Sequence, residues 1–136
     1  MLLGEAAEFG VSFNDVPPSQ NLSVTWDYGD GATESASYVG SQANIFKSHT
    51  YAETGTYDVT ITVSDGIDST VFNKTVTVSR AAIRTDPLDS SKTALVVLGT
   101  QNADSILVDP VAGGTYKVTL NGQVLGTTYA PTANRT

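Results

Sequence analysis

The 136-residue sequence contains no cysteine, one histidine and one methionine. The lack of cysteine excludes a disulfide framework, a zinc knuckle, an iron–sulfur cluster and a thiol nucleophile. A single histidine argues against histidine-based catalysis and against a multi-histidine metal site. The chain is also too short for most enzymes that have separate cofactor and substrate domains. We therefore expect no enzymatic activity.

Basic residues are scarce as well, because 7 Lys and Arg stand against 14 Asp and Glu, a net charge of −7. Residues 1–79 contain ten acidic and two basic residues (−8), whereas residues 80–136 contain four and five (+1). No basic stripe offsets the acidity, so we expect no nucleic-acid partner. No run approaches the roughly 18 apolar residues that span a bilayer, so we expect no membrane insertion. The change in charge near residue 80 predicts two modules.

Apolar and polar residues alternate with a period of two along most of the chain, which predicts half-buried β-strands. The clearest runs cover 22–28 and 57–63, and turn sequences rich in Gly and Asp follow both of them. No window of a dozen residues carries an apolar stripe of helical period. The sequence therefore predicts an all-β protein whose first 80 residues form an antiparallel sandwich. The side chains expected to point inward are Phe9, Val11, Phe13, Leu22, Val24 and Trp26, and a further strand places Phe72, Val76 and Val78 on one face.

The remainder of the chain divides into a linker and a second module. Residues 81–92 are polar and without periodicity, which predicts a linker. Strand signals resume in 93–136, where Asn121-Gly122 predicts a hairpin because a type I′ turn needs positive φ at both positions. A module of this size buries only a small core alone. We expect it to pack on the first module or to be one truncated unit of a repeat array.

Three sequence blocks carry a family resemblance: W-D-Y-G-D-G at 26–31, H-T-Y at 49–51 and G-T-Y-D-V-T-I-T-V-S-D-G at 55–66. Their order and spacing resemble the polycystic-kidney-disease (PKD) domain over about residues 5–79. Tyr28 stands where the family usually has Phe, and Ile61 where it usually has Leu. The resemblance implies an Ig-like β-sandwich that serves mostly in extracellular regions as a spacer, adhesion or mechanical module.

A weaker resemblance lies within residues 94–129, where 99–108 read G-T-Q-N-A-D-S-I-L-V. This segment is similar to one unit of bacterial surface-protein repeats related to the RTX calcium-binding repeats. The glycines usual in the RTX turn are replaced by Gln101 and Asn102, and only one unit is present, whereas the repeats act in stacks. Asp104 is therefore either a calcium ligand or a turn residue beside a buried Ile106.

The acidic residues of the first module suggest a second calcium hypothesis. The candidate ligands gather around predicted turns and are Asp27, Asp30, Asp65 and Asp68. Ca²⁺ prefers about six to eight oxygen ligands, which clustered loop carboxylates supply, and some members of the resembled family hold calcium. No D-x-D-x-D-G loop is present, so the alternative is solvated surface charge, with Asp27 and Asp30 accepting backbone N–H groups of their own turn.

Trp26 and His49 each allow a structural and a functional interpretation. Trp26 shares its face with apolar residues, which favours the core of a sandwich over a sugar-stacking platform. A carbohydrate platform would then depend on tyrosines such as Tyr38 or Tyr129. The surroundings of His49 lack the order of a Ser–His–acid triad, so we expect it to shape its loop through side-chain hydrogen bonds.

The favoured function is a non-catalytic module of a larger bacterial surface or secreted protein, acting in spacing, adhesion or protein interaction. Its expected partners are other domains of the same polypeptide and protein or polysaccharide surfaces, with the chain itself monomeric. We expect a secreted or cell-surface location, with any export signal outside these residues. The alternative is a substrate-binding accessory module of a secreted hydrolase, for a polysaccharide or a collagen-like polymer, which would need a row of exposed aromatics. Calcium is the one cofactor that the sequence suggests.

Overall fold

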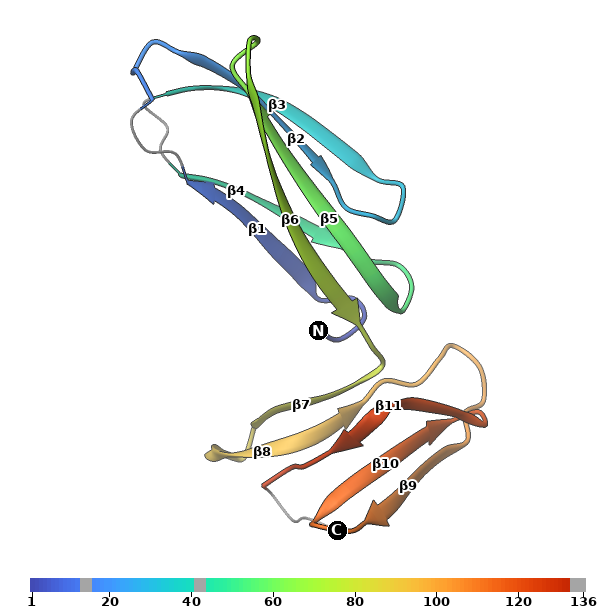
Figure 1. The fold of residues 1–136 in the computed structure, drawn as a ribbon. Coiled ribbons are helices and arrows are strands. Elements are labelled where there is room, and N and C mark those ends of the chain that lie inside the picture. Colours follow the sequence, from blue (N-terminus) through green and yellow to red (C-terminus); the bar gives the residue numbers. More distant parts are fainter. Residues whose placement is uncertain (13–15, 41–43, 133–136) are drawn as a thin grey trace. The chain divides into compact units, whose positions relative to one another are not determined.

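The computed structural model describes residues 1–12, 16–40 and 44–132, and within these ranges the chain forms eleven β-strands and no helix (Figure 1). The all-β prediction is therefore confirmed. No helix long and apolar enough to cross a membrane occurs in these ranges. The chain divides into two compact units. We call Gly4–Thr77 the sandwich unit, and Met1–Leu3 with Val78–Thr136 the C-terminal unit.

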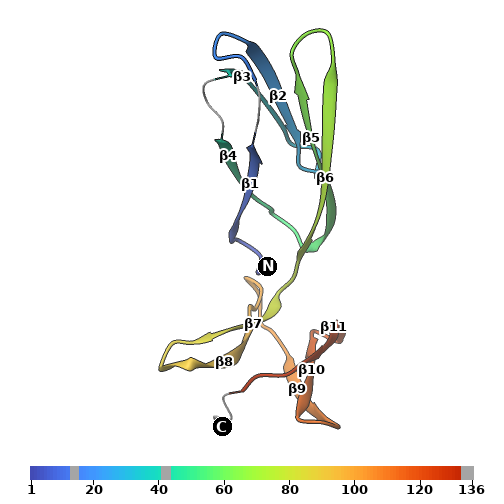
Figure 2. The same ribbon diagram turned by 60° about the vertical axis from the view of Figure 1, so that its left-hand side comes forward.

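Two antiparallel sheets face each other in the sandwich unit (Figure 2). One sheet pairs β1 (Ala6–Ser12) with β4 (Asn44–Thr50). The other has the order β3-β2-β5-β6, where the strands are β3 (Thr33–Val39), β2 (Asn21–Asp27), β5 (Gly55–Ser64) and β6 (Ser69–Val78). This arrangement is the Ig-like sandwich that the sequence predicts, and it leaves β1 and β6 as edge strands of the two sheets.

The core between the sheets follows the period-two pattern of the sequence. The buried side chains include Trp26, Val24 and Leu22 of β2 and Phe9 and Val11 of β1, as predicted. Strands β4, β5 and β6 add Ile45, Val59, Ile61, Val63, Val76 and Val78. Phe13, the remaining inward prediction, lies outside the described residues.

Phe72 departs from this pattern. It lies on the same face of β6 as Val76 and Val78, yet 46% of it is exposed. Strand β6 is an edge strand, and the sheet opposite has two strands against four. The facing sheet therefore leaves part of β6 uncovered. The alternation of apolar and polar residues in the sequence does not predict which part of a strand the opposite sheet covers.

The C-terminal unit contains a hairpin and a three-stranded sheet. The hairpin joins β7 (Ala81–Asp86) to β8 (Asp89–Val97), and the sheet has the order β11-β10-β9. Its strands are β9 (Ile106–Val111), β10 (Thr115–Leu120) and β11 (Gln123–Tyr129).

The hairpin replaces most of the linker expected at 81–92. Residues 81–86 pair in register with the apolar segment that follows, for example Ala81 with Val97 and Ile83 with Leu95. The Asp86 carboxylate accepts the Leu88 N–H at 2.8 Å and closes the turn. Backbone pairing with an apolar partner strand thus orders a segment whose own side chains lack a pattern, which is why the linker prediction fails there.

The Asn121-Gly122 hairpin is confirmed, whereas the buried Ile106 is not. Asn121 has φ of 51° and Gly122 of 84°, and Leu120 pairs with Gln123 across the turn. Ile106 is 47% exposed because β9 is an edge strand of its sheet. The buried residues of this sheet are instead Val118 and Leu120, on the central strand β10.

Candidate functional site

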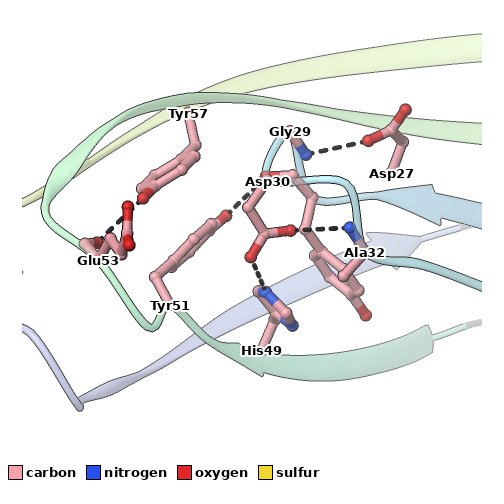
Figure 3. A network of polar contacts seen from close by, with 9 residues as sticks. Asp27, Gly29, Asp30, Ala32, His49, Tyr51, Glu53 and Tyr57 are labelled. Carbon is pink, nitrogen blue, oxygen red and sulfur yellow. Dashed lines mark hydrogen bonds and ion pairs between the residues drawn. The ribbon is translucent and has the colours of Figure 1, made fainter.

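The tight turn between β2 and β3 holds the two acidic residues of the first sequence block (Figure 3). Asp27 accepts the N–H of Gly29 at 2.9 Å, and Asp30 accepts the N–H of Ala32 at 3.0 Å. Gly29 and Gly31 have positive φ values of 78° and 92°, a backbone conformation that residues with a Cβ rarely adopt. Both carboxylates therefore satisfy backbone donors of their own turn, as the structural alternative predicted.

His49 connects this turn to the opposite sheet. Its Nε2 lies 2.8 Å from Oδ2 of Asp30, and its ring stacks on Tyr28 with centroids 4.0 Å apart and planes 6° apart. His49 belongs to β4, so the contact links the turn of one sheet to a strand of the other. Burial alone would raise the pKa of Asp30, but hydrogen bonds from His49 and from the Ala32 N–H outweigh it and hold that pKa below its usual range. The expectation that His49 forms a side-chain hydrogen bond is confirmed, but the bond holds the β2–β3 turn and not the loop that follows His49.

Two tyrosines, Tyr51 and Tyr57, extend the contact into the loop between β4 and β5. The Tyr51 ring meets His49 edge-on at 4.8 Å, and its hydroxyl donates to the Tyr28 carbonyl at 3.1 Å. Tyr57 stacks on Tyr51 at 4.3 Å and donates to the carbonyl of Glu53 at 3.0 Å. The sequence offers no signal for this ladder, because the partners come from different sequence blocks. Its role is to hold the loop against the β2–β3 turn.

Tyr28 is the one residue of this turn that differs from the family pattern, which usually has Phe at this position. Its side chain is fully buried, and the hydroxyl makes no hydrogen bond. The carboxylate of Glu34 acts on the hydroxyl electrostatically, without meeting the geometry of a hydrogen bond. Burial, followed by the negative charge of Glu34, raises the pKa of Tyr28 to about 12.

We expect Tyr28→Phe to raise the free energy of unfolding by about 1 kcal/mol, because it removes a buried hydroxyl without a partner. The matched variant Tyr51→Phe deletes a hydroxyl that is bonded to a buried carbonyl and should lower stability by about the same amount. Urea unfolding followed by Trp26 fluorescence measures both. A loss of stability in Tyr28→Phe would show that the hydroxyl bonds to Glu34.

Tyr28→Phe also tests how the stability of the fold depends on alkaline pH. The pKa of Tyr28 is raised from 10.0 in the unfolded chain to about 12 in the folded chain, so its titration leaves the free energy of unfolding unchanged below pH 10 and lowers it as pH rises from 10 toward 12. Unfolding free energies measured from pH 9 to 11 should therefore fall more steeply in the wild type than in Tyr28→Phe. Equal slopes in the two chains would contradict the assignment.

The five calcium candidates lie in three separate places. Asp27 and Asp30 share the β2–β3 turn, while Asp65 and Asp68 share the β5–β6 turn at the opposite end of the sheet, since Asp27 pairs with Thr60 and Ser23 with Ser64. In the described part of the chain no three His, Cys, Asp or Glu side chains gather as a metal site would require. Calcium binding at these residues therefore stays a prediction.

Asp65 and Asp104 are both held by hydrogen bonds within their loops. Asp65 accepts the N–H groups of Asp68 at 2.8 Å and Ile67 at 2.9 Å, which lower the pKa of its carboxyl. Asp104 accepts the hydroxyl and N–H of Thr100 at 2.7 and 2.6 Å and the side-chain amide of Asn121 at 2.8 Å. Asp104 thus ties its loop to the Asn121-Gly122 hairpin, a link between two sequence motifs that the sequence did not indicate.

Comparison with known protein families covers the same part of the chain. The family model of the PKD domain matches residues 2–79, a span that contains the β2–β3 turn, His49 and the tyrosine ladder. No curated protein and no solved structure matches the chain.

Proposed function

Since the chain belongs to the PKD domain family, we propose that it is a structural module of a larger extracellular protein and acts there as a spacer or adhesion unit. PKD domains are non-catalytic modules of larger proteins and are typically extracellular. A bacterial surface or secreted protein is the context that the repeat-like segment at 99–108 favours. Other domains of the same polypeptide would then be the first partners.

The observation that carries this proposal is how the motif residues are used. Asp27, Asp30 and His49 all bond within the turn or across to the opposite sheet. General acid–base catalysis would instead need titratable groups turned toward a substrate. These side chains stabilise the β2–β3 turn and join the two sheets, and such bonding suits a module selected for mechanical integrity.

Depletion from solution by insoluble polymers tests the proposal against the accessory-module alternative. The whole chain is mixed with fibrillar collagen, chitin or cellulose, and the protein left in the supernatant is measured. We expect complete recovery, because the tyrosines on which a platform would depend are engaged within the fold. Tyr38 packs edge-on against Trp26 at 6.2 Å, and Tyr129 donates to the Leu125 carbonyl at 3.0 Å. Saturable depletion by one polymer would contradict the spacer function and show that the chain is a binding module, either for adhesion or as an accessory to a hydrolase.

Calcium stabilisation is tested by thermal unfolding in EDTA and in millimolar calcium. An ion that binds only the folded chain raises the midpoint, by a free energy of RT ln(1 + [L]/Kd). A rise that disappears in a chain carrying Asp65→Asn and Asp68→Asn would assign the ion to the β5–β6 turn. Equal midpoints in both conditions would remove calcium from the proposal.

A further inference from the structure

A groove runs along the side of the sandwich unit between the edge strands β1 and β6. It consists of two hollows of about 310 and 250 Å³, which share Ser12 and Phe72 in their linings. The inner wall is apolar and includes the buried residues Val11 and Ile61. Phe72 lines both hollows while remaining 46% exposed. Removing apolar surface of this kind from water favours the binding of an apolar ligand.

The rim of the groove offers backbone hydrogen bonds. Within the described residues, β6 is bonded on one side to β5 and is the outermost strand of its sheet. An edge strand presents N–H and C=O groups that an added strand satisfies, while side chains at alternate positions enter neighbouring pockets. Directly after β6, Ser79 is already paired with the chain's own Met1 and Leu3. The part of β6 that an added strand can use is therefore Ser69–Val76, which is long enough for most of a peptide of about nine residues to pair with.

The charge of the sandwich unit determines which kind of peptide the groove attracts. Asp65 and Asp68 line one end of the groove, and Lys74 lines the other, with its Nζ 5.7 Å from the Phe9 ring. The sandwich unit carries ten acidic and two basic residues, a net charge of −8. A second copy of this unit would be repelled, whereas a cationic segment is attracted.

We propose that this groove binds an extended peptide segment of another protein, which adds to β6 as a strand. Its apolar side chains, at alternate positions, enter the hollows beside Phe72, and its basic side chains, on the other face of the added strand, are attracted by the net negative charge of the sandwich unit. This inference goes beyond the spacer function and does not depend on it, because a spacer needs no ligand.

The test uses a dye-labelled synthetic peptide of about nine residues in which Val and Lys alternate, with a Val–Glu peptide of the same length for comparison. Fluorescence anisotropy with the whole chain measures both affinities. We expect saturable binding of the Val–Lys peptide and at least about tenfold weaker binding of the Val–Glu peptide. Amide hydrogen exchange should slow within Ser69–Val76 when the Val–Lys peptide is present. Slowing confined to another strand would overturn the proposal.

Two neighbours on β6 form a matched pair of variants. Phe72 lines both hollows, whereas Val71, 51% exposed, lines neither. Threonine retains high strand propensity at either position. Phe72→Thr should weaken binding of the Val–Lys peptide about tenfold, while Val71→Thr leaves it within about twofold. Equal affinities of the two variants would show that the acidic surface attracts the peptide without specific contacts in the groove. That result would refute the proposal.

A second copy is tested separately by sedimentation equilibrium of the chain without peptide. We expect a monomer at every concentration that the method covers. A dimer that Phe72→Thr dissociates and Val71→Thr retains would make another copy the occupant and reject the peptide. None of these outcomes bears on polymer depletion, so the spacer proposal fails or stands by its own test.

Discussion

Gly29→Ala lowers the free energy of unfolding of the sandwich unit by about 3 kcal/mol or more, because the added methyl group combines an unfavourable backbone conformation with a steric clash. Gly29 has φ of 78°, and a Cβ placed on it would lie 2.7 Å from the backbone oxygen of Asp58 and 3.0 Å from its nitrogen. That backbone belongs to β5, which is paired on one side with β2 and on the other with β6. The neighbouring atoms therefore have little freedom to move away.

Gly31→Ala is the control because it adds the cost of an unfavourable backbone conformation without a steric clash. Gly31 has φ of 92°, but a Cβ there meets no atom within 4 Å. We expect it to cost about 1–2 kcal/mol, the usual penalty for a side chain in the left-handed region. Trp26 is the single tryptophan and is fully buried in the sandwich unit, so its fluorescence in urea reports on this unit. Equal losses for the two variants would mean that the turn shifts away from Asp58 at no cost.

His49→Ala is expected to lower the free energy of unfolding by about 2–3 kcal/mol. The variant loses the stacked contact with Tyr28 and the edge contact with Tyr51, and it leaves the Asp30 carboxylate without its partner in the opposite sheet. Lys47→Ala, on the same strand, is the control and should cost less, since its ion pair with Glu34 is more exposed.

A double-mutant cycle with Asp30→Asn separates the hydrogen-bonded pair from the ring contacts. If the 2.8 Å contact between His49 and Asp30 stabilises the fold, the double variant should lose less than the sum of the single losses. Additive losses would show that the two side chains act independently and that only the aromatic contacts of His49 matter.

The acid limb of the stability curve provides a second measure of Asp30. The pKa of Asp30 is lower in the folded chain than in the unfolded chain, so its contribution is present above the unfolded pKa, about 3.9, and is lost as pH falls through the folded value. Asp30→Asn should therefore flatten the decrease in unfolding free energy below pH 4. A decrease as steep as that of the wild type would assign the acid sensitivity to other carboxyl groups.

The sequence alone determined the fold class, the family and most of the core of the sandwich. Strand alternation is a local property, so it placed Trp26, Val24 and Phe9 inward without knowledge of the partner sheet. Turn chemistry is local too. The Asp27 and Asp30 carboxylates bond to N–H groups two residues away, and Asn121-Gly122 takes the positive φ of its hairpin.

Only the tertiary structure decided which strand faces are covered by another layer and which are exposed. A period of two identifies the face of Phe72 and Ile106 but not whether another layer covers it, and both residues lie on edge strands that remain exposed. The hairpin from 81 to 97 depends on pairing between strands rather than on the side chains of its first half. The acidic residues likewise occur at similar turns along the chain, but the antiparallel order of β2 and β5 places Asp27 and Asp65 at opposite ends of one sheet. Contacts between residues far apart in sequence are set by topology, and a single sequence reports topology only indirectly.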